Sequence, residues 1–218
     1  MEPFNRIYSR SKEEWLKNRV DGIGGSDASC VLGKNKYKSI IDLWQIKTNR
    51  KKRDKVNSEI VYYGTKAEEP LRELFKLTYK DKYKVYSKDY EILQSKKHSF
   101  MLGSLDGELE DLETGEKGVL EIKTARINSM YAKKDWQNDV PINYYIQILH
   151  YLLITGYKFA IICVEQRFEI DNKIWFLRKN IRFDRKDVID DLKVLEEEEV
   201  KFWNFVKEDK EPPLKISF

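Results

Sequence analysis

The chain has 218 residues, of which 41% are apolar and 36% are charged, and its 41 Lys and Arg are balanced by 37 Asp and Glu. This composition excludes a disordered chain, and the net charge of +4 permits a nucleic-acid partner without requiring one. Two Cys and two His exclude a zinc ribbon, an iron–sulfur cluster and a histidine-rich metal site. A bound metal would therefore have oxygen ligands, which favours magnesium or manganese.

The sequence has no internal repeat, no Pro/Gly/Ser-rich linker and no apolar signal core. No run approaches the ~18 apolar residues that span a membrane. We therefore expect a single domain over residues 1–218, located in the cytoplasm and without a membrane partner.

Three short helices are predicted from capping residues in the first 50 positions. They are expected over residues 12–19, 26–32 and 39–47, capped by Ser11, Ser26 and Ser39. In the third helix, helical spacing relates Ile40, Leu43, Trp44 and Lys47.

Glycines are crowded into GIGGSDAS, Gly22–Ser29, directly before the second helix. The segment lacks the third Gly of GxGxxG and the Gly-Lys-Ser/Thr of a P-loop, so neither nucleotide fold is supported. From the residues alone two interpretations stay open. One is a tight turn before a helix, and the other is a backbone turn that places an anion at a helix N-terminus.

A longer helix is predicted for GTKAEEPLRELFKLTY, residues 64–79. Glu68 borders its buried stripe, whereas Glu69 faces solvent, and Pro70 is expected near the first turn or at a kink. The expected inner stripe is Ala67, Leu71, Leu74, Phe75 and Thr78. The preceding RKKRDK, residues 50–55, is either a solvated basic loop or a contact to a DNA backbone.

The second half of the chain alternates strands and helices. FMLGSLDGELE and KGVLEIKTA predict two hairpin strands, and PINYYIQILHYLLITG predicts an apolar helix. Three further strands and a last helix follow, and this helix is capped by Asp184 and carries a solvent-facing EEEE run. This order predicts an α/β or α+β protein with a mixed central β-sheet flanked by helices.

The candidate chemistry lies in the strand VLEIK, where side chains alternate so that Glu121 and Lys123 share one face. If the turn centres on the Thr-Gly of DLETGE, Asp106 lies opposite Lys123 and diagonal to Glu121. Two such carboxylates can share Mg²⁺, and a third from Glu68 would need cations or protons to neutralise the repulsion. By spacing alone, a surface hairpin with a salt bridge is an open alternative.

Asp106 followed by Glu121-Ile122-Lys123 resembles the motif of the PD-(D/E)XK nuclease superfamily. Over residues 15–164 the chain resembles the YqaJ-type viral recombinase family, or phage lambda exonuclease family, in several segments that occur in the same order. These segments are WLKNRVDGIGGSDASCVLG, YKSIIDLW, YYGTKAEEPLRELF, GSLDGE, LEIKTA and PINYYIQILHYLLITG.

The resemblance implies a restriction-endonuclease-like core that hydrolyses phosphodiesters with two metal ions. It implies that Asp106, Glu121 and the Ile122 carbonyl bind metal, and that Glu68 binds the second metal or its waters. The role implied for Lys123 is to orient or activate the attacking water. The cofactor would be Mg²⁺, with Mn²⁺ able to substitute.

The resemblance also implies how DNA is held. Arg19 and Ser26 match the residues that grip the 5′ phosphate, and Trp15 lies one helical turn before Arg19. Gln147 is placed beside the scissile strand or the catalytic lysine, and Ser104 is a weaker candidate of the same kind. This set favours the phosphate site over the plain turn for the glycine segment.

We therefore predict a Mg²⁺-dependent 5′→3′ exonuclease that digests one strand of linear double-stranded DNA from a free end. The resemblance implies a phage or prophage origin, a single-strand annealing recombinase as partner, and a homotrimer ring. Two alternatives stay open: a structure-specific or restriction-type endonuclease with the same metal site, and a non-catalytic DNA-binding module.

Overall fold

The structure is a computed structural model that describes residues 2–52, 58–128, 136, 140–170 and 173–215. Residues 53–55 of the basic segment at residues 50–55 lie outside the described residues. Within the described part, no helix is both long enough and apolar enough to cross a membrane.

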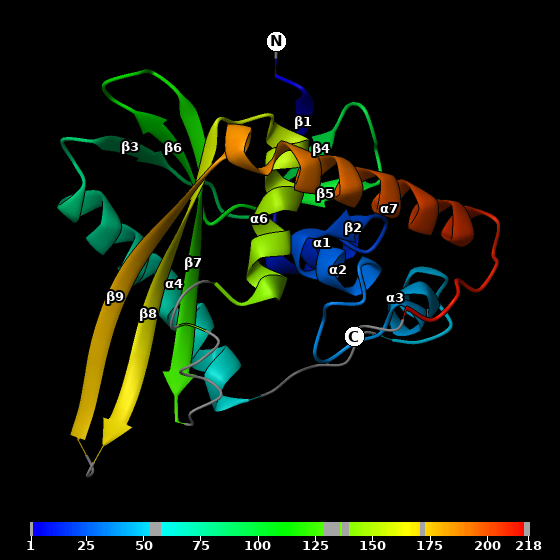
Figure 1. Cartoon of the computed structure of the whole chain (residues 1–218), viewed down its shortest axis with the longest axis horizontal. Helices are drawn as coiled ribbons and strands as arrows, with labels where there is room; N and C mark the ends of the chain where they lie inside the picture. Colours follow the sequence, from blue (N-terminus) through cyan, green and yellow to red (C-terminus); the bar gives the residue numbers. More distant parts are fainter. Residues whose placement is uncertain (1, 53–57, 129–135, 137–139, 171–172, 216–218) are drawn as a thin grey trace.

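Two sheets lie on either side of a central helix, α6 (Ile142–Thr155), which contacts strands of both (Figure 1). The four-stranded sheet has the order β1 (Phe4–Tyr8), β4 (Glu91–Ser95), β5 (Met101–Gly103), β2 (Ile23–Gly24). The five-stranded sheet has the order β3 (Tyr83–Tyr86), β6 (Gly107–Asp111), β7 (Lys117–Ile127), β8 (Phe159–Ile170), β9 (Lys173–Asp184). Both sheets mix parallel and antiparallel pairs, so the predicted fold class is confirmed. The sequence did not predict the four-stranded sheet, whose strands are short.

The other helices pack around the two sheets and α6. They are α1 (Lys12–Asn18), α2 (Gly25–Val31), α3 (Ile40–Lys47), α4 (Glu59–Thr78) and α7 (Ile189–Lys207), the last preceded by the 3₁₀ turn η1 (Arg185–Val188). The predicted caps at Ser11 and Ser39 are confirmed, because their side chains accept the backbone N–H of the residue three positions on. The apolar helix α6 ends at Gly156, whose φ of 67° is left-handed, as a C-terminal glycine allows.

One predicted strand is in fact two. The segment FMLGSLDGELE contributes β5 to the four-stranded sheet and β6 to the five-stranded sheet. The chain leaves one sheet and enters the other at Ser104–Asp106. β5 is continuously apolar and β6 alternates, and both patterns are typical of strands, so the sequence does not show the change of sheet.

The predicted hairpin register is wrong by two residues. Gly107 pairs with Leu120 and Glu110 with Lys117, so Asp106 follows the ladder opposite Glu121 rather than Lys123. The carboxylate of Asp111 accepts the backbone N–H groups of residues 113 and 114, and this closes a longer loop than the predicted turn. The shift brings the two carboxyl groups into directly opposed positions.

The helix α4 starts earlier and buries a different face than predicted. Leu71 and Phe75 are buried as expected, but Leu74 is 37% exposed and Arg72 is buried instead. Pro70 lies in the helix interior rather than its first turn. Pro70 has no N–H to donate to the Lys66 carbonyl one turn earlier. Both residues are exposed, so water can hydrogen-bond to this carbonyl instead.

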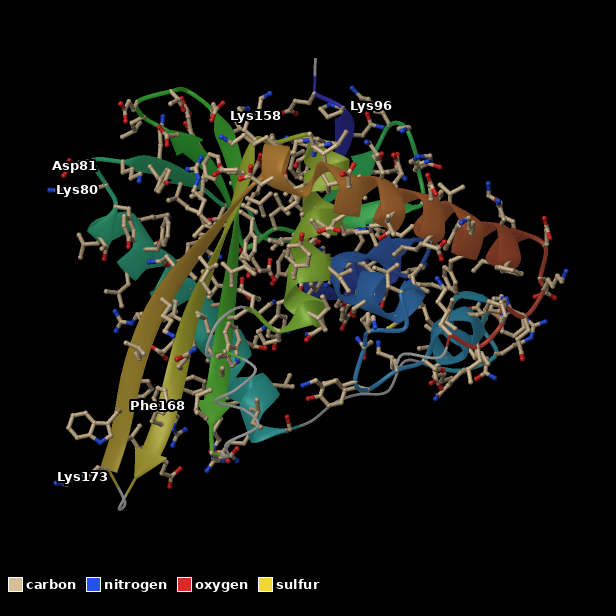
Figure 2. All side chains as sticks on the ribbon, viewed as in Figure 1. Lys80, Asp81, Lys96, Lys158, Phe168 and Lys173 are labelled. Carbon is tan, nitrogen blue, oxygen red and sulfur yellow. The ribbon has the colours of Figure 1, made fainter. Side chains whose placement is uncertain are left out.

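The strands β8 and β9 form a long hairpin whose free end projects away from the helices (Figure 1). Figure 2 shows Phe168 and Lys173 near this end. β9 is the edge of the sheet, and four consecutive apolar residues at its start are exposed: Ile174, Trp175, Phe176 and Leu177. These side chains alternate between the two faces of the hairpin.

The last helix is joined to α6 by a buried His–Glu pair. His150 Nδ1 lies 2.8 Å from Glu199 Oε1, and Nε2 lies 3.1 Å from the Leu102 carbonyl oxygen. His150 is thus a core histidine with both ring nitrogens bonded. The expectation that the whole EEEE run is solvated is wrong at Glu199, which is fully buried. Asp184 precedes η1 rather than α7, and its side chain does not cap it.

This pair makes stability depend on pH. Burial alone would lower the pKa of His150, but the Glu199 carboxylate and the Leu102 carbonyl raise it above its ordinary value. The folded state therefore binds this proton more tightly than the unfolded chain does. The contribution is fully present below pH ~6.5 and is lost as the pH rises through the folded-state pKa. We expect urea unfolding to show this decline in the wild type and not in the His150→Gln/Glu199→Gln variant. An unchanged slope would contradict the ion pair.

Candidate active site

The junction between the two sheets positions Asp106. This residue lies just before β6, and its Oδ2 accepts the backbone N–H of Ile122 on β7 at 2.7 Å. Its own backbone carbonyl accepts Nη1 of Arg72 on α4 at 2.9 Å. The side chain and the backbone of Asp106 are therefore each held by a neighbouring element, and the carboxyl group is directed toward the middle of β7.

Glu121 and Lys123 lie on the face of β7 that is turned toward α6. Lys123 Nζ donates a short hydrogen bond to Glu121 Oε1, which also accepts Gln147 Nε2 at 2.6 Å. Glu121 is 2% exposed, and its other oxygen, Oε2, is buried without a hydrogen-bond partner among the described residues. The Lys123 amine lies over the ring of Tyr144, with Nζ 5.0 Å from the ring centroid.

Glu68 faces the same place from α4. Its Oε1 accepts Nη1 of Arg72 at 3.4 Å, one helical turn away, and the side chain is 43% exposed. Burial, and then the charge on Asp106, raises the pKa of Glu68, and burial followed by the charges on Asp106 and Glu68 raises that of Glu121. The structure therefore brings Glu68, Asp106, Glu121 and Lys123 together in one site.

Burial is the main influence on the carboxyl groups of this site. Burial, followed by the charge on Asp106, raises the pKa of Glu121 to about 8. Burial also raises the pKa of Asp106, although Lys123 and the Ile122 N–H oppose this. Burial alone would lower the pKa of Lys123, but Glu121 and Asp106 raise it above its ordinary value, so the amine stays protonated.

These residues fit a divalent cation with oxygen ligands. The buried Oε2 of Glu121, which has no hydrogen-bond partner among the described residues, is an oxygen that such a cation could bind. Among the described residues, no group of three or more His, Cys, Asp and Glu side chains is arranged to hold one ion. A cation here would be held by carboxylates and completed by backbone carbonyl or water oxygens.

The glycine turn, residues 22–25, is anchored by a buried ion pair. Lys47 of α3 is fully buried, and its Nζ lies 3.0 Å from Oδ2 of Asp27, which is itself 1% exposed. The same amine donates to the carbonyl of Gly22 and, at 3.4 Å, to that of Val20. Lys47 thus ties the whole turn to α3.

The predicted cap of α2 is wrong by two residues. Gly24 is the N-cap, and its backbone N–H donates to Asp27 Oδ2 at 3.4 Å. Ser26 lies inside the first turn with an exposed side chain. The hydroxyl is therefore not used for capping and faces solvent beside the turn.

Arg19 and Trp15 lie next to this turn. The Arg19 guanidinium lies over the Trp15 ring, 4.2 Å from its centroid, and one of its nitrogens is 4.0 Å from where a Cβ on Gly24 would sit. Trp15 Nε1 donates to Ser104 Oγ at 3.1 Å. The positive charge of Arg19 also lowers the pKa of Asp106, which places Arg19 within electrostatic reach of the carboxyl cluster.

Comparison with known proteins gives the family. A family model described as the YqaJ-like viral recombinase domain matches residues 14–158, which include the glycine turn, α4 and the carboxyl cluster. The chain belongs to the YqaJ-like viral recombinase domain family. It is 33% identical over 200 residues to the uncharacterized protein YqaJ of Bacillus subtilis strain 168. This match covers 89% of the chain but 56% of that relative, so the chain spans about half its length.

Solved structures share the fold of this YqaJ-like chain. The alkaline exonuclease LHK-Exo of Laribacter hongkongensis superposes with a TM-score of 0.65 at 16% identity, covering 91% of this chain and 94% of that one. A phage-related exonuclease of Haemophilus somnus 129PT gives a TM-score of 0.55 at 13% identity, covering 86% and 96%. The fold is therefore the restriction-endonuclease-like fold of alkaline exonucleases.

Sequence reasoning missed two residues of the YqaJ-like site. Arg72 joins Glu68 to the Asp106 backbone, and the hydroxyl of Tyr151 accepts Gln147 Nε2 at 2.9 Å. The signal was present, because each lies four positions after a predicted site residue, on the same helix face. It was overlooked because Arg72 reads as a surface residue and Tyr151 as part of an apolar helix.

Tyr151 also packs so close to Gly25 that no larger residue fits at this position of the glycine turn. A Cβ at Gly25 would lie 2.6 Å from the Tyr151 ring, whereas one at Gly24 would meet nothing closer than 3.8 Å. We expect Gly25→Ala to destabilise the protein by about 1–3 kcal/mol through overpacking. Gly24→Ala, the matched control, should lose markedly less in the same urea titration. Equal losses would contradict the close approach of Tyr151.

Proposed function

We propose that this YqaJ-like protein is a Mg²⁺-dependent exonuclease that digests one strand of linear double-stranded DNA from the 5′ end. The observation that carries the proposal is the convergence of Glu68, Asp106, Glu121 and Lys123 around one partly open site. Membership of a viral recombinase family supports a DNA substrate. The exonuclease fold neighbours support nuclease chemistry.

The proposed roles follow from contacts. Lys123, whose amine lies against Glu121, is proposed to orient or activate the attacking water. Its Glu121 contact fixes where the amine lies, and Gln147 holds the same carboxylate oxygen from α6. Arg72 fixes the backbone of Asp106. Asp106 and Glu121 are thus each held from a second element, which favours preorganised catalysis.

The metal is part of this proposal. Asp106, Glu121 and the Ile122 carbonyl would hold one divalent cation, and Glu68 would hold a second or its waters. Bound divalent cations would supply Lewis-acid polarisation of the phosphodiester and a more acidic water. Mn²⁺ is expected to substitute for Mg²⁺, because both prefer oxygen ligands.

Arg19 and Ser26 are proposed to bind the 5′ phosphate. Arg19 lies beside the glycine turn, and Ser26 exposes its hydroxyl in the first turn of α2. We expect wild-type protein to digest 5′-phosphorylated duplex about 10-fold or more faster than 5′-hydroxyl duplex, since hydrogen bonds to charged groups contribute ~1.5–3 kcal/mol. Arg19→Ala should remove this preference when initial rates on the two ends are compared. Equal rates in the wild type would contradict the phosphate site.

A comparison of linear with covalently closed circular duplex tests the proposed activity. We expect Mg²⁺-dependent release of nucleotides from linear DNA and none from closed circles. Labelling the 5′ or the 3′ terminus of each strand then gives the polarity. Cutting of closed circles would favour the endonuclease alternative, and binding without cleavage would favour the non-catalytic module.

A single-strand annealing recombinase is the proposed partner, since the family is named for viral recombinases. The digestion of one strand would leave the complementary strand exposed for such a protein. The homotrimer ring implied by the sequence resemblance stays a prediction, and light scattering of the purified chain would test it.

A further inference from the structure

Two aromatic side chains form a pair beside the candidate active site. The ring centroids of Trp15 and Tyr90 are 6.4 Å apart, with the planes inclined at 59°. Tyr90 is 40% exposed, and Arg19 lies over the Trp15 ring. An exposed tyrosine beside a half-buried tryptophan and a guanidinium is the kind of surface on which nucleobases stack in single-strand binding sites.

The pair is fixed close to the carboxyl cluster. Trp15 Nε1 donates to Ser104 Oγ, and that hydroxyl donates to the Glu91 carbonyl at 3.0 Å. Ser104 is two residues before Asp106, and consecutive Cα atoms are ~3.8 Å apart, so the two Cα atoms are at most ~7.6 Å apart. The ring pair therefore lies within reach of a nucleotide whose phosphate is near Asp106 or Arg19.

Tyr90 is held in an unusual backbone conformation. Its φ is 60°, in the left-handed region that bulky side chains rarely adopt. The only other described non-glycine residues with positive φ are Asn49 and Asp209, which are types that tolerate it. The Tyr90 carbonyl accepts the Ser9 N–H at 3.1 Å, and the next residue, Glu91, enters β4. Conformations of this cost cluster at ligand-binding sites.

We propose that Tyr90, together with Trp15, forms a stacking platform for the nucleobase of the 5′-terminal nucleotide. The position of this nucleotide relative to Arg19 rests on the proposed function. Stacking on an aromatic face accepts every base. A platform of this kind would hold the strand end without restricting which sequence is digested, and it assigns Tyr90 to substrate binding rather than to the reaction itself.

A binding experiment tests the platform without relying on cleavage. The probe is a 5′-phosphorylated duplex with 2-aminopurine at its 5′ terminus, mixed with protein in the absence of divalent ions. We expect wild type and Tyr90→Phe to change the 2-aminopurine fluorescence by stacking, and Tyr90→Ala to do so much less. Tyr86→Ala is the matched control, because Tyr86 is 43% exposed but lies on β3. Equal fluorescence changes in Tyr90→Ala and wild type would overturn the proposal.

Kinetics separate stacking from a structural role of Tyr90. In Mg²⁺, Tyr90→Ala should lower kcat/KM roughly 5- to 150-fold on a normal 5′ end, mainly through KM, and much less on an abasic 5′ end. Tyr90→Gly relieves the backbone cost yet should be as defective as Tyr90→Ala. The same loss on normal and abasic ends would overturn the proposal. A wild type that stacks the probe but digests nothing would instead contradict the proposed nuclease function alone.

Discussion

Lys123→Met is expected to lower the rate of digestion of linear duplex by about 10²–10⁴-fold, the range for a positioned proton-transfer or water-orienting group. The side chain lies between Glu121 and the open part of the site, and its amine stays protonated. Methionine keeps the length of the side chain and removes the charge and the donors. Single-turnover digestion of an end-labelled duplex gives the chemical step directly.

Two controls make the Lys123→Met result specific. Circular dichroism and urea unfolding should show a folded protein, because the lost cation leaves Glu121 able to take up a proton at its raised pKa. Lys76→Met on α4 removes a surface ion pair with Glu73 and should digest DNA at the wild-type rate. Retention of digestion by Lys123→Met within a few-fold would remove the mechanism proposed for this amine.

Lys47→Met is expected to destabilise the fold by about 3–5 kcal/mol, the usual effect of removing one partner of a buried ion pair. The side chains of Lys47 and Asp27 are 0% and 1% exposed, so the carboxylate cannot turn to water when the amine is gone. The carbonyls of Val20 and Gly22 would lose a donor at the same time. The midpoint of urea unfolding measures this loss.

The matched control is Lys51→Met, four residues further along the chain. Lys51 Nζ lies 2.7 Å from Asp42 Oδ1, but both side chains are well exposed, at 40% and 32%. Exposed pairs contribute ~0–1 kcal/mol, so this variant should unfold close to the wild type. If the two variants lost the same stability, burial would not be what makes Lys47 important.

The sequence predicted best where one element alone determines the outcome. The caps at Ser11 and Ser39, the limits of α6, and the shared face of Glu121 and Lys123 all follow from local spacing. The family resemblance, which rests on whole segments in order, is confirmed by the match to residues 14–158. The fold class is confirmed as well.

Prediction failed where two distant elements decide a position. The register between β6 and β7 depends on side-chain hydrogen bonds within the loop, which turn signals alone do not give. Arg72 is buried because it donates to the Asp106 carbonyl, and Glu199 is buried because it pairs with His150. Both partners lie on other elements of the fold. No local pattern distinguishes such residues from solvated charges. The metal and the role of each site residue stay predictions.

The passage of one strand segment from the four-stranded to the five-stranded sheet has a mechanical consequence. Ser104 and Asp106 are the two ends of this three-residue passage. Ser104 accepts a hydrogen bond from Trp15, and Asp106 belongs to the carboxyl cluster. Neither sheet can shift against the other without pulling on this passage. Warming that loosens the packing of the two sheets around α6 should therefore abolish the proposed nuclease activity while most of the secondary structure persists.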